Sequence, residues 1–171
     1  MNALRVSYGI PDEKLFVAYN GVDTKFRDIK KVSQKEKNQI SDQFQLEQFW
    51  TLLYFGHSGV SKGIDFLIEM IPILIEKYPD LKIIFNIIPA QRDKIINKKI
   101  QNSIHRLDPK DQSRIQISHG LKKEELRALL ANVDGVIAPS LSEGFGSVHT
   151  ETLALQTPLI TTRVSAIPEV V

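Results

Sequence analysis

Residues 140–155 read Ser140-Leu-Ser-Glu-Gly-Phe-Gly-Ser-Val-His-Thr-Glu-Thr-Leu-Ala-Leu155, and the rest of the chain can be interpreted outward from them. Two glutamates in this stretch, Glu143 and Glu151, lie eight positions apart on either side of Gly144-Phe145-Gly146. A short apolar run, Gly135 to Ala138, comes just before. The pattern predicts a buried strand, a tight loop and a helix N-terminus. One carboxylate is expected in the loop and the other about one turn into the helix.

A helix N-terminus that follows glycines suits an elongated anion such as a nucleotide sugar. Free backbone N–H groups and the positive end of the helix dipole attract a diphosphate, and glycines let the backbone come close to it. Carboxylates would repel the diphosphate, so we expect them to bind hydroxyl groups at the two ends of the ligand. An ionised carboxylate can accept both protons of a vicinal diol. Glu143 is therefore expected to hold the sugar and Glu151 the ribose.

Three motifs in order resemble the donor-binding, C-terminal half of retaining glycosyltransferases of the GT-B fold, family four. The signature of that family is two glutamates separated by seven residues, as Glu143 and Glu151 are here. The resemblance spans most of the chain. Its motifs are Asn20-Gly-Val-Asp23, Gly56 through Lys62-Gly63, and the run from Glu143 to Glu151 followed by Ala154, Thr157-Pro158-Leu-Ile-Thr161 and Ile167-Pro-Glu-Val170.

Length and composition describe one ordinary soluble domain. A chain of 171 residues can bury about 70% of its unfolded surface, which is enough for a real core. The net charge of +2 makes no case for nucleic acid as a partner, and the absence of cysteine excludes disulfides and thiolate metal sites. The sequence has no apolar run of transmembrane length and no signal-peptide pattern. A cytosolic location is the default expectation, and peripheral attachment to a membrane through an absent half is the alternative.

The resemblance also predicts how the chain divides. Residues 1–24 would be the remnant of the acceptor domain and the crossover between domains, and residues 25–171 the donor-binding domain, shortened at its C-terminal end. Leu15 to Tyr19 is an apolar run of strand length, closed by the turn pair Asn20-Gly21. It matches the last strand of the acceptor domain. The alternative is a small protein whose first strand forms an ordinary hairpin or edge.

From residue 25 onward, a polar segment with a helix near Ser33 to Phe44 leads into alternating strands and helices. Such alternation predicts an α/β, Rossmann-like, doubly wound parallel sheet in the order 3-2-1-4-5-6, with the third strand at an edge. Lysines 30, 31, 35 and 37 are interpreted as a solvated face, and Pro72 is expected to kink the first crossover helix. The five expected strands are residues 51–55, 81–88, 114–118, 135–138 and 158–161, and the helices between them carry apolar stripes at Ile64 to Tyr78, Ile96 to Ile104 and Leu126 to Val133.

Lys62 follows the first strand, where ligands sit in open α/β sheets. The resemblance makes it the lysine that neutralises the donor diphosphate and, with Glu143, a catalytic residue, because charge develops on the leaving oxygens as the glycosidic bond breaks. His57 departs from the family, which usually has an arginine there. Diphosphate binding is therefore either weaker and pH dependent, or compensated by donors from Ser58, Gly59 and Ser61. A structural role for His57, and a solvated one for Lys62, are the alternatives.

The remaining donor-binding assignments concern backbone groups and the nucleobase. The loop at His119 and Leu121 matches the one that flanks the nucleobase in the family. His149 is interpreted as packing, and Asp134 and Glu169 as structural. We expect no metal, since the four histidines have no suitable spacing, and no cofactor, since the nucleotide-diphosphate sugar is itself the substrate. Backbone N–H groups are expected to face the donor at Gly144, Phe145, Gly146, Ser147 and Val148.

Two other functions are alternatives to a retaining glycosyltransferase. A nicotinamide dehydrogenase needs G-x-G-x-x-G after the first strand, which Gly56, Gly59 and Gly63 do not fit, and an acidic residue after the second, where Pro89-Ala-Gln-Arg92 stands. The other is a module that binds a sugar nucleotide without turning it over. The expected partners are a nucleotide sugar, a missing acceptor domain, and an acceptor that is a glycan, a lipid or another small molecule.

Overall fold

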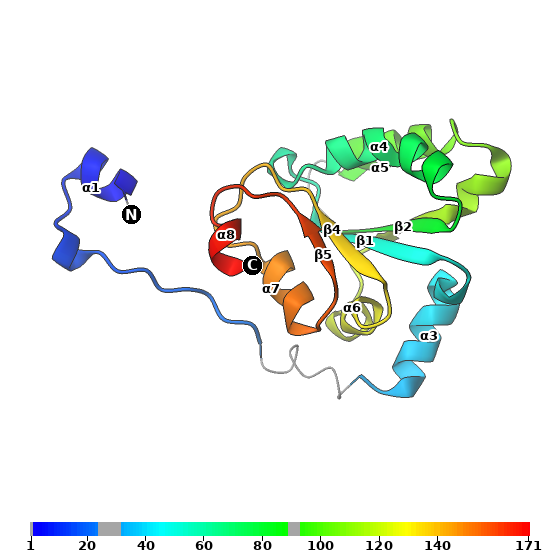
Figure 1. Cartoon of the computed structure of the whole chain (residues 1–171), viewed down its shortest axis with the longest axis horizontal. Coiled ribbons are helices and arrows are strands. Elements are labelled where there is room, and N and C mark those ends of the chain that lie inside the picture. Colours follow the sequence, from blue (N-terminus) through cyan, green and yellow to red (C-terminus); the bar gives the residue numbers. More distant parts are fainter. Residues whose placement is uncertain (1, 24–31, 89–92) are drawn as a thin grey trace.

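A computed structural model describes residues 2–23, 32–88 and 93–171. Its centre is one parallel sheet in the order β3-β2-β1-β4-β5 (Figure 1). This arrangement confirms the predicted α/β, Rossmann-like fold and the edge position of the third strand. The strands are β1 (Trp50–His57), β2 (Leu81–Ile88), β3 (Ile115–His119), β4 (Gly135–Ala138) and β5 (Leu159–Thr161).

Helices cover both faces of the sheet because alternate residues of each strand point to opposite sides. Leu52 and Tyr54 of β1 belong to the core on one face, together with α4 and α5, while Leu53 and Phe55 pack on the other face with α3 and α6. Figure 1 shows these two helical layers above and below the strands. The helices are α3 (Gln34–Phe44), α4 (Ile64–Lys77), α5 (Asp93–Ile104), α6 (Lys123–Leu130), α7 (Ser147–Ala154) and α8 (Ile167–Val170).

The helix boundaries follow local sequence signals. Ser33 caps α3, as its side chain accepts from the N–H of Glu36 while the Glu36 carboxylate accepts from the N–H of Ser33. The predicted helix near Ser33 to Phe44 is thereby confirmed, and Pro72 lies inside α4. Short 3-10 turns connect the larger elements: η3 (Leu46–Gln48), η4 (Val60–Lys62) and η5 (Pro109–Arg114).

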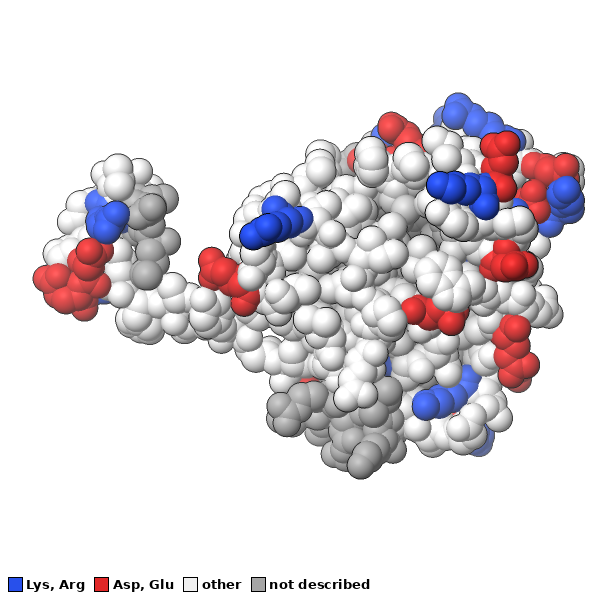
Figure 2. Space-filling model, viewed as in Figure 1, with Lys and Arg blue, Asp and Glu red and all other residues white. Residues whose placement is uncertain are grey.

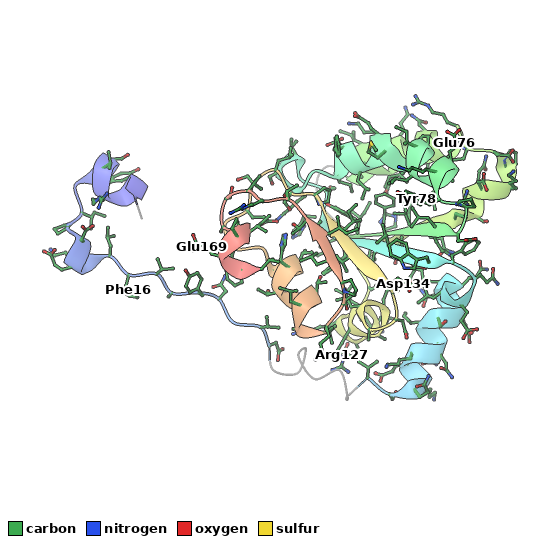
Figure 3. The ribbon with its side chains drawn as sticks, viewed as in Figure 1. Phe16, Glu76, Tyr78, Arg127, Asp134 and Glu169 are labelled. Carbon is green, nitrogen blue, oxygen red and sulfur yellow. The ribbon has the colours of Figure 1, made fainter. Side chains whose placement is uncertain are left out.

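The N-terminal segment differs from its prediction. Leu15 to Tyr19 is not a strand, and it is preceded by a helix, α1 (Asn2–Tyr8), and a turn, η1 (Asp12–Lys14), that were not predicted. A strand needs a neighbour for its backbone groups, and none pairs with this run among the described residues. Phe16 is 87% exposed and stands away from the sheet in Figure 3. Predictions that involve the boundary at residue 24, Lys30, Lys31 or residues 89–92 lie outside the described residues.

Candidate functional site

The loops after β1 and β4 touch each other at the carboxyl edge of the sheet. The backbone N–H groups of Leu141 and Ser142 both donate to the carbonyl of Ser61, at 2.7 and 3.2 Å. Gly63 lies so close to the second loop that a Cβ atom there would be 1.9 Å from the carbonyl oxygen of Pro139. Neighbouring parallel strands end side by side, so residues about 80 positions apart in sequence meet in this contact.

Lys62 and Glu143 form an ion pair across these two loops. The Lys62 Nζ lies 2.7 Å from Glu143 Oε1, and the two side chains are 28% and 6% exposed. The hydroxyl of Ser140 donates to the same carboxylate oxygen at 3.0 Å. The two residues predicted to be catalytic are thus brought together, and the carboxylate is held by a second donor within its own loop.

The start of α7 lies just beyond Glu143 and depends on a glycine. Gly146 has φ 89°, a conformation that residues with side chains rarely adopt, and a Cβ atom there would be 2.5 Å from Nδ1 of His149. Gly146 also has no side chain to cap the helix, which leaves its first N–H groups suited to an anion. Phe145, Ser147 and Val148, whose N–H groups are predicted to face the donor, are the neighbours of Gly146 in sequence.

His149 is a packing residue, as expected. It is fully buried, and burial lowers the pKa of its imidazole, which favours the neutral ring. Its Nε2 lies 2.7 Å from Oγ1 of Thr161, and that hydroxyl donates to the carbonyl of Ala138 at 2.9 Å. His149 therefore ties α7 to β4 and β5.

Glu151 lines a pocket of about 360 Å³ that includes residues at the start of α7. Residues 20–23 of the N-terminal segment form one wall, and Phe145, Ser147 and Thr150 of the β4–α7 region form another. Lys123 of α6 also lines the pocket and bonds to Asp23 at 2.6 Å. Glu143 is not part of this wall. Glu151 thus lines a pocket that does not include the Lys62–Glu143 pair.

The raised pKa of Glu151 leads to a stability prediction. Burial raises the pKa of this carboxyl above its ordinary 4.5, and Lys123 opposes the effect. Because the folded pKa exceeds the unfolded one, the carboxyl contributes stability below pH 4.5, and this contribution is lost as pH rises through the folded pKa. The substitution Glu151→Gln keeps the shape of the side chain and removes its negative charge. We expect the variant to have a higher melting temperature than the wild type near neutral pH, with the difference shrinking toward about pH 4.

Thermal unfolding from about pH 4 to about pH 8 would measure this difference. Glu13→Gln, at an exposed glutamate of η1, is the matched control and should show no such trend. A Glu151→Gln variant less stable than the wild type at neutral pH would contradict the prediction.

The other predicted site residues lie at the same edge of the sheet but do not line the Glu151 pocket. His57 is the exposed last residue of β1. His119 ends β3 and lies 3.4 Å from Asn97 through Nε2 and Nδ2, and the N–H of Leu121 donates to Asn86 Oδ1 at 3.4 Å. Among the described residues, no group of three or more His, Cys, Asp or Glu side chains is placed to hold a metal ion.

Sequence reasoning did not single out Lys123 as a site residue. Nothing in its neighbourhood in sequence distinguishes it from the other lysines, because its role depends on the fold bringing the start of α6 to the pocket that Glu151 lines. Ser140 begins the stretch from residue 140 to 155, but its contact with Glu143 depends on the turn of the loop. Asn20-Gly-Val-Asp23 was noted as a motif, and only the structure brings it to the Glu151 pocket.

Comparison with known proteins adds independent information. A family model described as glycosyl transferases group 1 matches residues 50–171. The chain is 23% identical over 169 residues to an uncharacterized glycosyltransferase of Methanocaldococcus jannaschii, an alignment that covers 96% of this chain and 40% of that protein. It is 29% identical over 119 residues to the phosphatidylinositol N-acetylglucosaminyltransferase GPI3 subunit of Saccharomyces cerevisiae, covering 70% of this chain and 25% of that protein.

Solved structures share the fold. A glycosyltransferase from Rickettsia africae superposes with a TM-score of 0.83 at 20% identity, over 98% of this chain and 43% of the other. HepE of Anabaena, crystallised with UDP and glucose, has a TM-score of 0.79 at 21% identity, over 97% of this chain and 43% of the other. The chain therefore spans less than half the length of these relatives. Within the described ranges, no helix has the length and apolar character needed to cross a membrane.

Proposed function

Since this chain belongs to the glycosyl transferases group 1 family, we propose that it is the donor-binding half of a retaining glycosyltransferase and binds a nucleoside-diphosphate sugar. The observation that carries this proposal is the Lys62–Glu143 ion pair between the loops that precede α4 and α7, with Glu151 of α7 lining a pocket of its own. A cation and free N–H groups suit the diphosphate, and the two acids would bind hydroxyl groups, Glu143 those of the sugar and Glu151 those of the ribose.

The Lys62–Glu143 ion pair suggests how the donor enters. The diphosphate would take Lys62 from Glu143, and the freed carboxylate would then accept hydroxyl protons from the sugar. When the glycosidic bond breaks, the diphosphate leaves with the bonding electrons, and Lys62 and the α7 N–H groups would stabilise the charge on its oxygens. In this proposal the nucleotide sugar is the only small molecule the half-site needs, and no metal or cofactor is assigned.

Glu151 would bind the ribose hydroxyls in the pocket beside residues 20–23. A UDP-sugar is the donor to test first, because UDP-glucose was bound in the Anabaena neighbour, whose TM-score in that complex is 0.77. Sugar transfer itself requires an acceptor-binding wall. We therefore propose that this chain binds the donor, and that transfer to a glycan, lipid or other acceptor depends on a second domain.

Two substitutions test this division of labour. Glu151→Ala should weaken UDP and UDP-glucose alike, by about tenfold, because it removes charge-assisted hydrogen bonds to the ribose that both ligands share. Glu143→Ala should spare UDP and weaken UDP-glucose by a similar factor. Thermal shift titrations measure both, since a ligand at 100 times its dissociation constant adds about 2.7 kcal/mol to the free energy of unfolding.

A nicotinamide dinucleotide in the same titration should cause no shift. Equal losses for both ligands in both variants would reject the separate roles of Glu143 and Glu151. An absence of any shift with UDP, GDP, ADP and their sugars would reject donor binding altogether.

A further inference from the structure

A second pocket lies at the amino ends of the strands, whereas the proposed donor site lies at their carboxyl ends. It has a volume of about 410 Å³. Its lining includes Gln34, Asn38 and Ser41 of α3, Trp50 of β1, and Asn132 and Asp134 between α6 and β4. We call it the Trp50 pocket. Trp50 begins β1 and His57 ends it, so about 23 Å of strand separates the two sites. Figure 3 shows Asp134 on the α3 side of the sheet and Glu169, in α8, on the opposite side of the view.

Trp50 presents an exposed ring on a rigid backbone. The residue is 50% exposed, yet its N–H donates to the carbonyl of Asp80 at 2.8 Å and it pairs in register with Leu81 of β2. The adjacent Phe49 makes a cation–π contact with a buried side chain, because Lys82 Nζ lies 5.6 Å from the centre of the Phe49 ring. Trp50 lines the pocket and is half exposed, so its indole can offer an apolar surface to a ligand there.

Amide, hydroxyl and carboxylate groups surround this platform, and internal hydrogen bonds hold several of them in place. Gln34 Nε2 donates to Asn38 Oδ1 at 2.8 Å, and Asn132 Nδ2 donates to the carbonyl of Lys37 at 3.1 Å. Asp134 Oδ2 accepts from the N–H of Thr51 at 2.7 Å. These bonds use only part of each group's capacity, so the Asn38 amide still offers N–H donors and the Asn132 amide still offers an oxygen.

The combination selects for a neutral polyhydroxy ligand. Each sugar hydroxyl both donates and accepts, and the pocket offers donors and acceptors side by side. The C–H face of a pyranose ring is apolar and can pack on an indole, burying apolar area. The pocket has one lysine, Lys37, against two carboxylates, Glu47 and Asp134, which disfavours phosphates and other anions.

We propose that the Trp50 pocket is a binding site for an uncharged oligosaccharide, separate from the donor site. This inference does not depend on the proposed function, because it rests on different residues at the other edge of the sheet.

The chain carries its own probe for this site, since Trp50 is its single tryptophan. The experiment is a titration of the full 171-residue chain with gluco-, manno- and chito-oligosaccharides, following tryptophan emission. We expect a saturable change in intensity with a blue shift for at least one neutral series, as the ring leaves water. UDP, which we place at the other edge, should leave the emission unchanged. No saturable change with any neutral series, or a response to UDP or acidic saccharides alone, would overturn the proposal.

Two substitutions on one helix provide the matched test. Asn38→Ala removes an amide from the pocket and should weaken the oligosaccharide by about fivefold, the value of one hydrogen bond. Gln39 is the next residue of α3, is also exposed, and lines a different hollow, so Gln39→Ala should have no effect. Trp50→Ala, followed by calorimetry on protein whose fold is checked by circular dichroism, should abolish binding. Unchanged affinity in both Asn38→Ala and Trp50→Ala would refute the site.

Discussion

Gly63→Ala is expected to lower the free energy of unfolding by about 3–5 kcal/mol, which is near the upper end for a single substitution. An alanine Cβ would lie 1.9 Å from the carbonyl oxygen of Pro139 and 2.8 Å from its carbonyl carbon. Both atoms belong to backbone, so no side chain can rotate away. The residue also has φ 67°. An L-residue with a side chain is strained in this conformation, which adds to the loss in the free energy of unfolding.

Relief of this clash would separate the loop after β1 from the loop after β4. Because Lys62 and Glu143 meet across those two loops, we expect Gly63→Ala to lose UDP-glucose binding even at temperatures where it is folded. Denaturant unfolding and thermal shift measure the two effects. Gly59→Ala is the control within the same loop, since its φ is −64° and its nearest neighbours would be 3.7 and 3.9 Å from the new Cβ. A loss below about 1 kcal/mol for Gly63→Ala would contradict the structure.

Strands were the most predictable part of this fold. A sheet covered on both faces demands continuous apolar runs, and β2 and β4 begin and end where those runs do, at Leu81–Ile88 and Gly135–Ala138. Leu15 to Tyr19 is also a continuous apolar run, but it does not form a strand. A strand also needs a neighbouring strand to pair with. The sheet was predictable from short-range pattern, whereas the pairing of an isolated run was not.

The sequence predicts which residues belong to the candidate site better than it predicts the contacts between them. Lys62 and Glu143 were both expected at the carboxyl edge, since that edge is common to all parallel strands. Their direct ion pair depends on side-chain directions in two loops, which no periodicity encodes. Lys123 belongs to the Glu151 pocket because α6 and residues 20–23 converge there. Its partner Asp23 lies 100 positions away in sequence.

Charge on the surface gives little guidance to the site. Figure 2 shows basic and acidic side chains interspersed over the visible face, with no field of a single sign. A diphosphate would therefore be recognised by local groups rather than by long-range attraction. Lys62 is the group best placed to supply the positive charge, because it is partly buried between the loops after β1 and β4. The uncapped N–H groups of α7 would add to its effect.

Lys62→Ala should weaken UDP and UDP-glucose by about 100-fold, because a charge-assisted contact to phosphate contributes about 1.5–3 kcal/mol and the substitution also leaves Glu143 to repel the ligand. The same substitution should destabilise the free protein by about 1–3 kcal/mol, since the Glu143 carboxylate would remain largely buried without its cation. Thermal shift titrations and denaturant unfolding report these two losses independently. Lys99→Ala, which removes a lysine paired with Asp65 on the helical face, should leave UDP affinity unchanged.

The double variant Lys62→Ala/Glu143→Gln separates binding from structure. Neutralising the carboxylate removes the unpaired charge, and the Ser140 hydroxyl can still bond to the amide that replaces it. Stability should therefore return to within about 1 kcal/mol of the wild type. UDP affinity should recover only the part that came from repulsion by Glu143 and should stay at least tenfold below wild type, because no cation faces the diphosphate. If affinity returned together with stability, Lys62 would be a structural partner of Glu143 rather than a ligand of the donor.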